Sequence, residues 1–189
     1  MVKKSLTKTC GNGLKNGKLQ ILYEDNHIIA VNKFCGEIVQ GDKTGDIPLT
    51  DKVKSYIKNK YNKPGKVFLG LPHRLDRPVS GAVVLARTSK ALNRLNELFK
   101  NKEVKKTYWA IVKQPPPERE GRLVHWLKKN EAKNKSFSVK GGGTGAKQAV
   151  LTYRHAASSK EYHLLEINLE TGRHHQIRAQ LAEIGSPVK

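Results

Sequence analysis

The stretch Pro72-His-Arg-Leu-Asp-Arg-Pro-Val-Ser-Gly81 decides how this chain is interpreted. It lies between two short apolar runs, residues 67–71 and 82–86, which we expect to be β-strands. Two prolines and a glycine exclude regular structure throughout the stretch, so we expect it to form a connecting loop. We therefore expect this polar loop to lead into an apolar strand.

Asp76 is the acidic residue of this loop, and Arg74 and Arg77 flank it. Neighbouring guanidinium groups favour the ionised form of a carboxylate. An ionised carboxylate on a loop of a rigid scaffold can act as a nucleophile or a base. The residues alone also allow a structural aspartate that caps a turn or pairs with an arginine.

Outward from this loop, the sequence predicts a protein of mixed α and β structure. Two β-rich runs, residues 19–24 and 27–32, are separated by Asp25-Asn26 and predict a hairpin. Further strands are expected over residues 107–112, 148–153 and 162–168. Helices are expected over residues 51–62, from residue 88 or 89 to 100, and from His174 to Gly185. We expect Thr50 to cap the first helix.

Residues 128–147 carry six lysines, four glycines and one acid, Glu131. We expect a mobile basic loop, which is either a solvated linker or a flap that contacts RNA.

Charge is the strongest feature of the composition. Lys+Arg number 36 against 16 Asp+Glu, which leaves a net charge of +20 and a pI of about 10.0. This charge indicates a polyanionic partner, most simply nucleic acid, with acidic membrane surfaces and plain solubility as alternatives.

No apolar run approaches the ~18 residues of a membrane helix. The N-terminus lacks a signal peptide's apolar stretch, and Cys10 and Cys35 form no disulfide framework, so we expect a cytoplasmic protein without membrane contact.

Two further segments carry candidate functional groups. Along Lys105–Val112, strand alternation places Tyr108, Ala110 and Val112 on one face. Tyr108 could stack on a base, move a proton, or simply pack.

In Leu169–Arg178, a glycine turn leads into a helix whose first turn bears Arg173, His174 and His175. Cations there oppose the helix dipole, which predicts an anion beside them, either a phosphate or a buried carboxylate. Zinc is the rival interpretation. Adjacent histidines on a helix point about 100° apart, so we expect no metal site.

Together the three segments resemble the RluA-type family of RNA pseudouridine synthases. The matching motifs are His73–Gly81, Lys106-Thr-Tyr-Trp-Ala110 and Thr171-Gly-Arg-His-His-Gln-Ile-Arg178, in the family's order, and the opening hairpin is also similar. The resemblance implies one α+β catalytic domain over residues 19–189, with a mixed, mostly antiparallel sheet, flanking helices and an RNA-binding cleft. Residues 1–18 would be a flexible basic lead-in.

The resemblance also implies roles for individual residues. Asp76 matches the catalytic aspartate, Tyr108 the tyrosine that stacks on the uracil and can take part in proton transfer, and Arg178 the arginine that pairs with the carboxylate. Arg74 matches the arginine that fills the gap left by the flipped nucleotide. We group four neighbouring residues with it as RNA-binding: His73, Arg77, Arg173 and His175.

The implied activity is isomerisation of uridine to pseudouridine in ribosomal or transfer RNA. It needs no cofactor and no metal, and we expect a monomer. The alternatives are a catalytically inactive RNA-binding protein or RNA chaperone on the same fold, and, more remotely, a Cys/His hydrolase built on Cys35.

The chain departs from the family pattern at several points. Lys33-Phe-Cys-Gly36 stands where relatives usually have Lys-Pro-Ala-Gly, and Val79 stands where many have threonine. The chain ends at Lys189, where relatives continue with a Gly-Asp segment, so we expect the catalytic domain to be C-terminally incomplete. At the other end we expect no room for the S4-type RNA-binding domain of some relatives.

Overall fold

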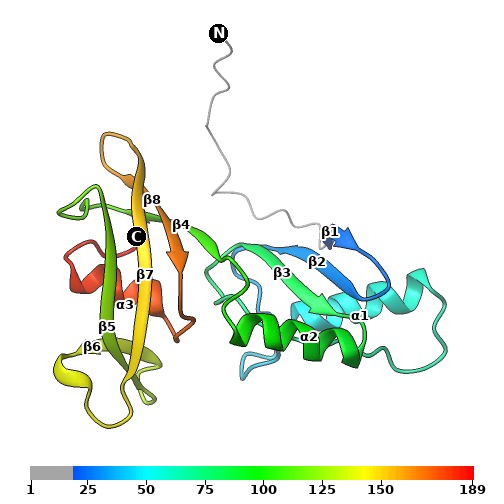
Figure 1. Cartoon of the computed structure of the whole chain (residues 1–189). Helices are drawn as coiled ribbons and strands as arrows, with labels where there is room; N and C mark the ends of the chain where they lie inside the picture. The colour runs from blue at the N-terminus through cyan, green and yellow to red at the C-terminus, as the bar shows by residue number, and fades with distance from the viewer. Residues whose placement is uncertain (1–18) are drawn as a thin grey trace. The chain divides into compact units, whose positions relative to one another are not determined.

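The computed structural model describes residues 19–189, and the lead-in expected over residues 1–18 lies outside that range. The chain forms two compact units, Met1–Leu95 and Asn96–Lys189. Each unit has an antiparallel sheet, as Figure 1 shows. Each unit also has a hydrophobic core of its own. The predicted α+β class is confirmed, whereas a single catalytic domain over residues 19–189 stays a prediction.

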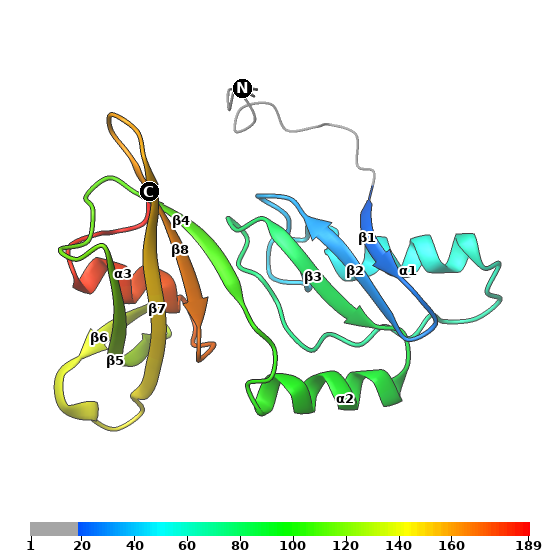
Figure 2. The same cartoon turned by 45° about the horizontal axis from the view of Figure 1, so that its top comes forward.

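The first unit is built on a three-stranded sheet of order β1-β2-β3. Its strands are β1 (Gln20–Glu24), β2 (Ile28–Lys33) and β3 (Gly81–Ala86), and its helices are α1 (Leu49–Lys60) and the start of α2 (Ser89–Lys100). The predicted β1–β2 hairpin is confirmed. The core joins the sheet to α1 through Ile29, Val31, Val39, Leu49, Val53, Ile57, Val83 and Leu85. Figures 1 and 2 show α1 along one face of this sheet.

The starts of the two helices differ in how they are capped. Thr88 caps α2, because its hydroxyl accepts a hydrogen bond from the backbone N–H of Ala91 at 3.1 Å. Thr88 was one of the two predicted caps, the other being Ser89. The predicted Thr50 cap of α1 is wrong. That helix begins at Leu49 after Pro48, which forms no side-chain cap. Leu49 is almost fully buried, so its packing in the core makes the helix begin before Thr50.

Residues 67–71 do not form the predicted strand. Only Gly70 pairs, in an isolated bridge with Ala86 whose two hydrogen bonds measure 2.8 and 2.9 Å. A Cβ atom at Gly70 would lie 2.8 Å from the side chain of Leu92, so α2 packs directly over the glycine backbone. The neighbouring apolar residues Val67, Leu69 and Leu71 pack against the core without extending the sheet.

The second unit contains a five-stranded sheet of order β4-β8-β7-β5-β6. Its strands are β4 (Thr107–Val112), β5 (Glu120–Asn130), β6 (Lys135–Val139), β7 (Lys147–Ser158) and β8 (His163–Leu169). Helix α3 (Gln176–Glu183) packs on one face through Leu181, Ile177 and Ile184 (Figure 2). All pairs of neighbouring strands in both sheets are antiparallel, so the described strands form two antiparallel sheets in place of the one mixed sheet expected.

The mobile loop predicted over residues 128–147 is wrong. Strands β5 and β6 pair as an antiparallel hairpin, with Trp126 opposite Val139 at one end and Asn130 opposite Lys135 at the other. A short 3-10 helix, η1 (Lys140–Gly142), follows. The lysines do not prevent pairing, because all six are exposed to solvent. High charge density indicated exposure here, not absence of structure.

Candidate active site

The loop that carries Asp76 is a tight turn in the first unit. The N–H of Val79 donates to the carbonyl of Asp76 at 3.0 Å, and the N–H of Gly36 donates to the carbonyl of Arg77 at 2.9 Å. Asp76 is partly buried. The turn is therefore joined by its backbone to the segment that follows β2.

Lys33 anchors this turn through hydrogen bonds from its side chain. It is the last residue of β2 and is fully buried. Its ammonium group donates to the carbonyls of Phe34 at 3.1 Å, Arg77 at 3.0 Å and Val79 at 2.5 Å. Burial lowers the pKa of Lys33, while the nearby carboxylates of Glu37 and Asp76 oppose that shift.

No role for Lys33 was predicted from the sequence, although a signal was present. Ile29, Val31 and Lys33 alternate along β2 and share the buried face of the strand. A lysine at a core position indicates a buried polar partner, because a buried charge must be hydrogen-bonded.

The three other candidate residues of this loop have distinct surroundings. The Nε2 atom of His73 accepts a hydrogen bond from the backbone N–H of Val84 at 3.0 Å, which ties the loop to β3. Arg74 is exposed and donates to the side-chain oxygen of Gln40 at 3.3 Å. Arg77 pairs with Asp46 at 2.7 Å, and both side chains are about half exposed. Arg74 and Arg77 are thus accessible cations, whereas His73 has a structural bond.

Tyr108 lies in the second unit, on β4. The prediction that Tyr108, Ala110 and Val112 share one face is confirmed, since Ala110 and Val112 are core residues and Tyr108 packs against that core. The opposite face of β4 is exposed, with Trp109 and Ile111 74% and 51% accessible. Tyr108 is therefore on the same face of the sheet as α3.

The predicted helix start at His174 is wrong, because α3 begins at Gln176 and His175 has a left-handed backbone with φ of 51°. The rings of His174 and His175 stack at 3.7 Å. The argument from helical spacing against a shared metal therefore does not apply to them. Within residues 19–189, no cluster of three or more His, Cys, Asp or Glu side chains is arranged to hold a metal ion.

Buried amides set the position of α3. Gln176, 3% exposed, donates to the carbonyl of Val150 at 3.0 Å and accepts from the Thr171 hydroxyl at 2.8 Å and the Arg173 N–H at 2.9 Å. Gln180, fully buried, donates to the carbonyl of Ala149 at 3.1 Å. These bonds, which sequence reasoning missed, fix the helix on β7.

Arg173 and Arg178 flank this anchored segment. The Nε atom of Arg173 donates to the carbonyl of Gln148 at 3.0 Å, although the side chain is exposed. Arg178 is partly buried and lies on α3 next to Ile177, which packs on the core. The candidate residues therefore divide between the units: His73, Arg74, Asp76 and Arg77 belong to the first, and Tyr108, Arg173, His175 and Arg178 to the second.

One family model covers all the segments that carry the candidate residues. The model of a family described as RNA pseudouridylate synthase matches residues 27–183, a span that includes Asp76, Tyr108 and Arg178. The chain belongs to this family. The expected resemblance to RluA-type pseudouridine synthases is therefore confirmed.

The curated relatives that the chain resembles are also named as pseudouridine synthases. The chain is 31% identical over 175 residues to an uncharacterized RNA pseudouridine synthase of Synechocystis sp., covering 92% of this chain and 54% of that protein. It is 33% identical over 178 residues to ribosomal large subunit pseudouridine synthase D of Borreliella burgdorferi, covering 92% and 53%. The chain thus spans about half the length of the curated relatives it matches.

Solved structures show the same fold. The human RNA pseudouridylate synthase domain containing 4 aligns with a TM-score of 0.76 at 27% identity, over 89% of this chain and 66% of that one. The human domain containing 1 aligns with a TM-score of 0.69 at 21% identity, over 90% and 67%. In the part of the chain that the structure describes, no helix is both long and apolar enough to span a membrane.

Proposed function

We propose that this protein isomerises uridine to pseudouridine in ribosomal or transfer RNA, with Asp76 as the reacting carboxylate. The observation that carries the proposal is the family match over residues 27–183, which includes the anchored loop of Asp76. The loop geometry supports it, because a buried lysine and two backbone hydrogen bonds hold the turn in one conformation. A preorganised carboxylate is what a reaction at a sugar carbon requires.

The reaction breaks the N1–C1′ glycosidic bond of uridine and joins C5 to C1′. N1 gains a proton and C5 loses one, so no atom is gained overall and there is no net change of oxidation state. Asp76 would either attack C1′ or remove the C2′ proton. Tyr108 or a water would accept the C5 proton, and Arg178 would pair with the carboxylate and orient it.

The target nucleotide must leave its stack before it can react, which costs a few kcal/mol and favours loops and bulges. Tyr108 would offset part of this cost by stacking on the uracil, and Arg74 by filling the vacated space. The exposure of Arg74 supports its assignment, since its guanidinium is accessible to RNA.

Tritium release from RNA labelled at C5 of uridine tests the activity, because binding alone releases nothing. We expect release by the wild-type protein and none by Asp76→Asn, with RNA affinity nearly unchanged. Asp42→Asn is the matched control, since Asp42 is an exposed carboxylate of the same unit. Full turnover by Asp76→Asn would refute the role of Asp76. RNA binding without release by the wild type would favour the inactive RNA-binding alternative.

A further inference from the structure

Two exposed aromatic side chains lie on the β5–β6 hairpin, on the face of the sheet opposite α3. Trp126 is 40% and Phe137 is 45% exposed. Trp126 pairs with Val139 and Lys128 with Phe137 in the antiparallel register, so these four side chains share one face. Trp126 and Phe137 are diagonal neighbours, a spacing of about 7–8 Å that aromatic side chains can bridge.

Lysines surround these aromatic rings. Lys128 lies directly across from Phe137, and Lys135 precedes Phe137 by two residues on the same face. The one acid of residues 128–147, Glu131, pairs with Lys129 at 2.6 Å, and Lys129 points to the other face of β5. The face that carries the aromatic rings is thus positively charged. It suits a partner that has a negatively charged backbone and flat apolar groups.

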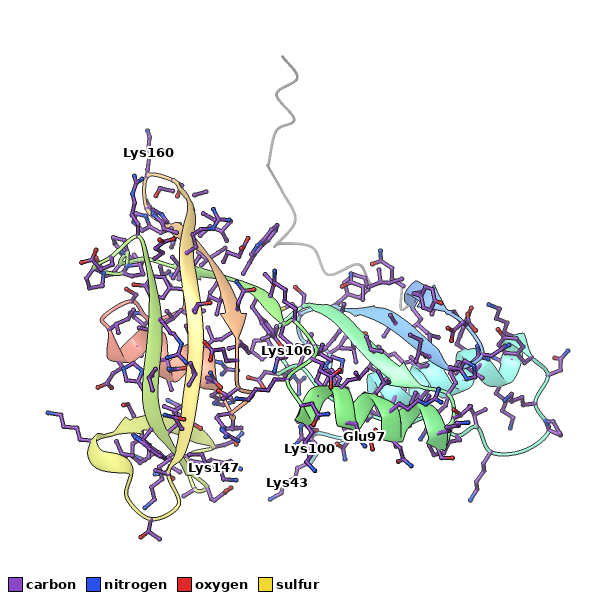
Figure 3. The ribbon with its side chains drawn as sticks, viewed as in Figure 1. Lys43, Glu97, Lys100, Lys106, Lys147 and Lys160 are labelled. Carbon is purple, nitrogen blue, oxygen red and sulfur yellow. The ribbon has the colours of Figure 1, made fainter. Side chains whose placement is uncertain are left out.

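The scaffold beneath this surface is well packed. On its other face the hairpin is held by buried Leu127, which packs with Ala149 and Ala179, and by the Ser136 hydroxyl 2.9 Å from Nδ1 of His174. On its own face Gly142 approaches the Trp126 ring so closely that a Cβ atom there would lie 3.0 Å from it. Figure 3 shows Lys147 at this end of the sheet and Lys160 at the other, at the β7–β8 turn.

We propose that Trp126 and Phe137 form a stacking surface for unpaired RNA bases, with Lys128 and Lys135 binding the adjoining phosphates. Aromatic side chains beside cations are the usual means of binding single strands without sequence preference. The surface lies entirely within the second unit and uses none of the residues assigned to the reaction. It rests on the proposed function only in that RNA is the ligand of both.

The two tryptophans of the chain, Trp109 and Trp126, allow a direct test. In the Trp109→Phe variant of the full chain, Trp126 is the sole tryptophan, and a base stacked on it quenches its fluorescence. The probe is a 12-residue oligocytidylate, which contains no uridine and cannot be a substrate. We expect saturable quenching in Trp109→Phe and none in Trp126→Phe.

Phe137→Ala in the Trp109→Phe background should weaken binding of the oligonucleotide about tenfold, and Phe137→Tyr should restore it. Phe68→Ala, which removes a 48% exposed phenylalanine from the first unit, is the matched control and should change nothing. Equal quenching by inorganic polyphosphate would overturn the proposal in favour of charge alone. Sedimentation as a dimer that Phe137→Ala dissociates would overturn it in favour of self-association. Tritium release is measured separately, so either proposal can fail without the other.

Discussion

The ammonium group of Lys33 donates a hydrogen bond to the carbonyl of Arg77 across 44 residues of sequence, at 3.0 Å. This bond and the one to Val79 join the end of β2 to the turn that carries Asp76. The buried lysine is the second donor to the carbonyl of Arg77, which also accepts from the N–H of Gly36, and it is the donor to the carbonyl of Val79. The candidate carboxylate is therefore positioned from the core of the first unit.

Lys33→Met should remove this anchor while keeping most of the buried volume. We expect the free energy of unfolding to fall by about 3 kcal/mol, because the carbonyls of Phe34, Arg77 and Val79 each lose a hydrogen bond from a charged donor. We also expect a lower kcat at temperatures where the variant is folded, with RNA affinity little changed. Urea unfolding and tritium release measure the two effects. Lys54→Met, at a half-exposed lysine, is the control, and an unchanged kcat in Lys33→Met would contradict a positioning role.

Tyr108→Phe should separate proton transfer from stacking, since the ring is kept and only the hydroxyl is removed. We expect kcat to fall about 100-fold if the hydroxyl takes part in acid–base chemistry. RNA affinity should stay close to that of the wild type, as measured by filter binding with unlabelled RNA. A kcat equal to that of the wild type would assign the C5 proton to water.

Glu24 should make the first unit sensitive to acid. Burial raises the pKa of Glu24, but hydrogen bonds from Lys60, Tyr61 and Tyr56 lower it by more, so the net pKa lies below 4.5. A carboxylate with a lowered folded-state pKa contributes stability above its unfolded pKa and loses it as pH falls through the folded pKa. Glu24→Gln should therefore be less stable than wild type at pH 7, by about 2 kcal/mol.

The difference between Glu24→Gln and wild type should shrink as pH falls below 4.5, as thermal unfolding at a series of pH values would show. Glu161→Gln, at an exposed glutamate, is the control. A stability difference that stayed constant down to pH 2 would show that the charge of Glu24 is not responsible.

Gly142 and Gly143 form a matched pair for the β6–β7 connection. Gly142 has φ of 67° and lies against Trp126, whereas a Cβ atom at Gly143 would contact nothing. Gly142→Ala should cost about 1–2 kcal/mol from the left-handed backbone alone, and the ring must also shift. Gly143→Ala should be nearly neutral. Urea unfolding compares them, and equal stabilities would show that the close approach to Trp126 does not constrain this turn.

Short-range patterns in the sequence were enough to predict much of the fold. Alternation along β4 predicted the shared face of Tyr108, Ala110 and Val112, and the Asp25-Asn26 turn predicted the first hairpin. These features depend on residues a few positions apart, whose side-chain periodicity is set by the backbone itself. The motifs around Asp76, Tyr108 and Arg178 likewise predicted the family from their order alone.

Only the tertiary structure decided how the candidate residues are supported. Lys33 bonds to the carbonyl of Val79, 46 positions away, and Gln176 bonds to that of Val150, 26 positions away, which moves the start of α3 past His175. The pairing of β5 with β6 was hidden by the lysine content of both strands. Periodicity shows which side of an element is buried, but the partner of a buried polar group is chosen by long-range packing. That partner can be seen only when distant segments are brought together.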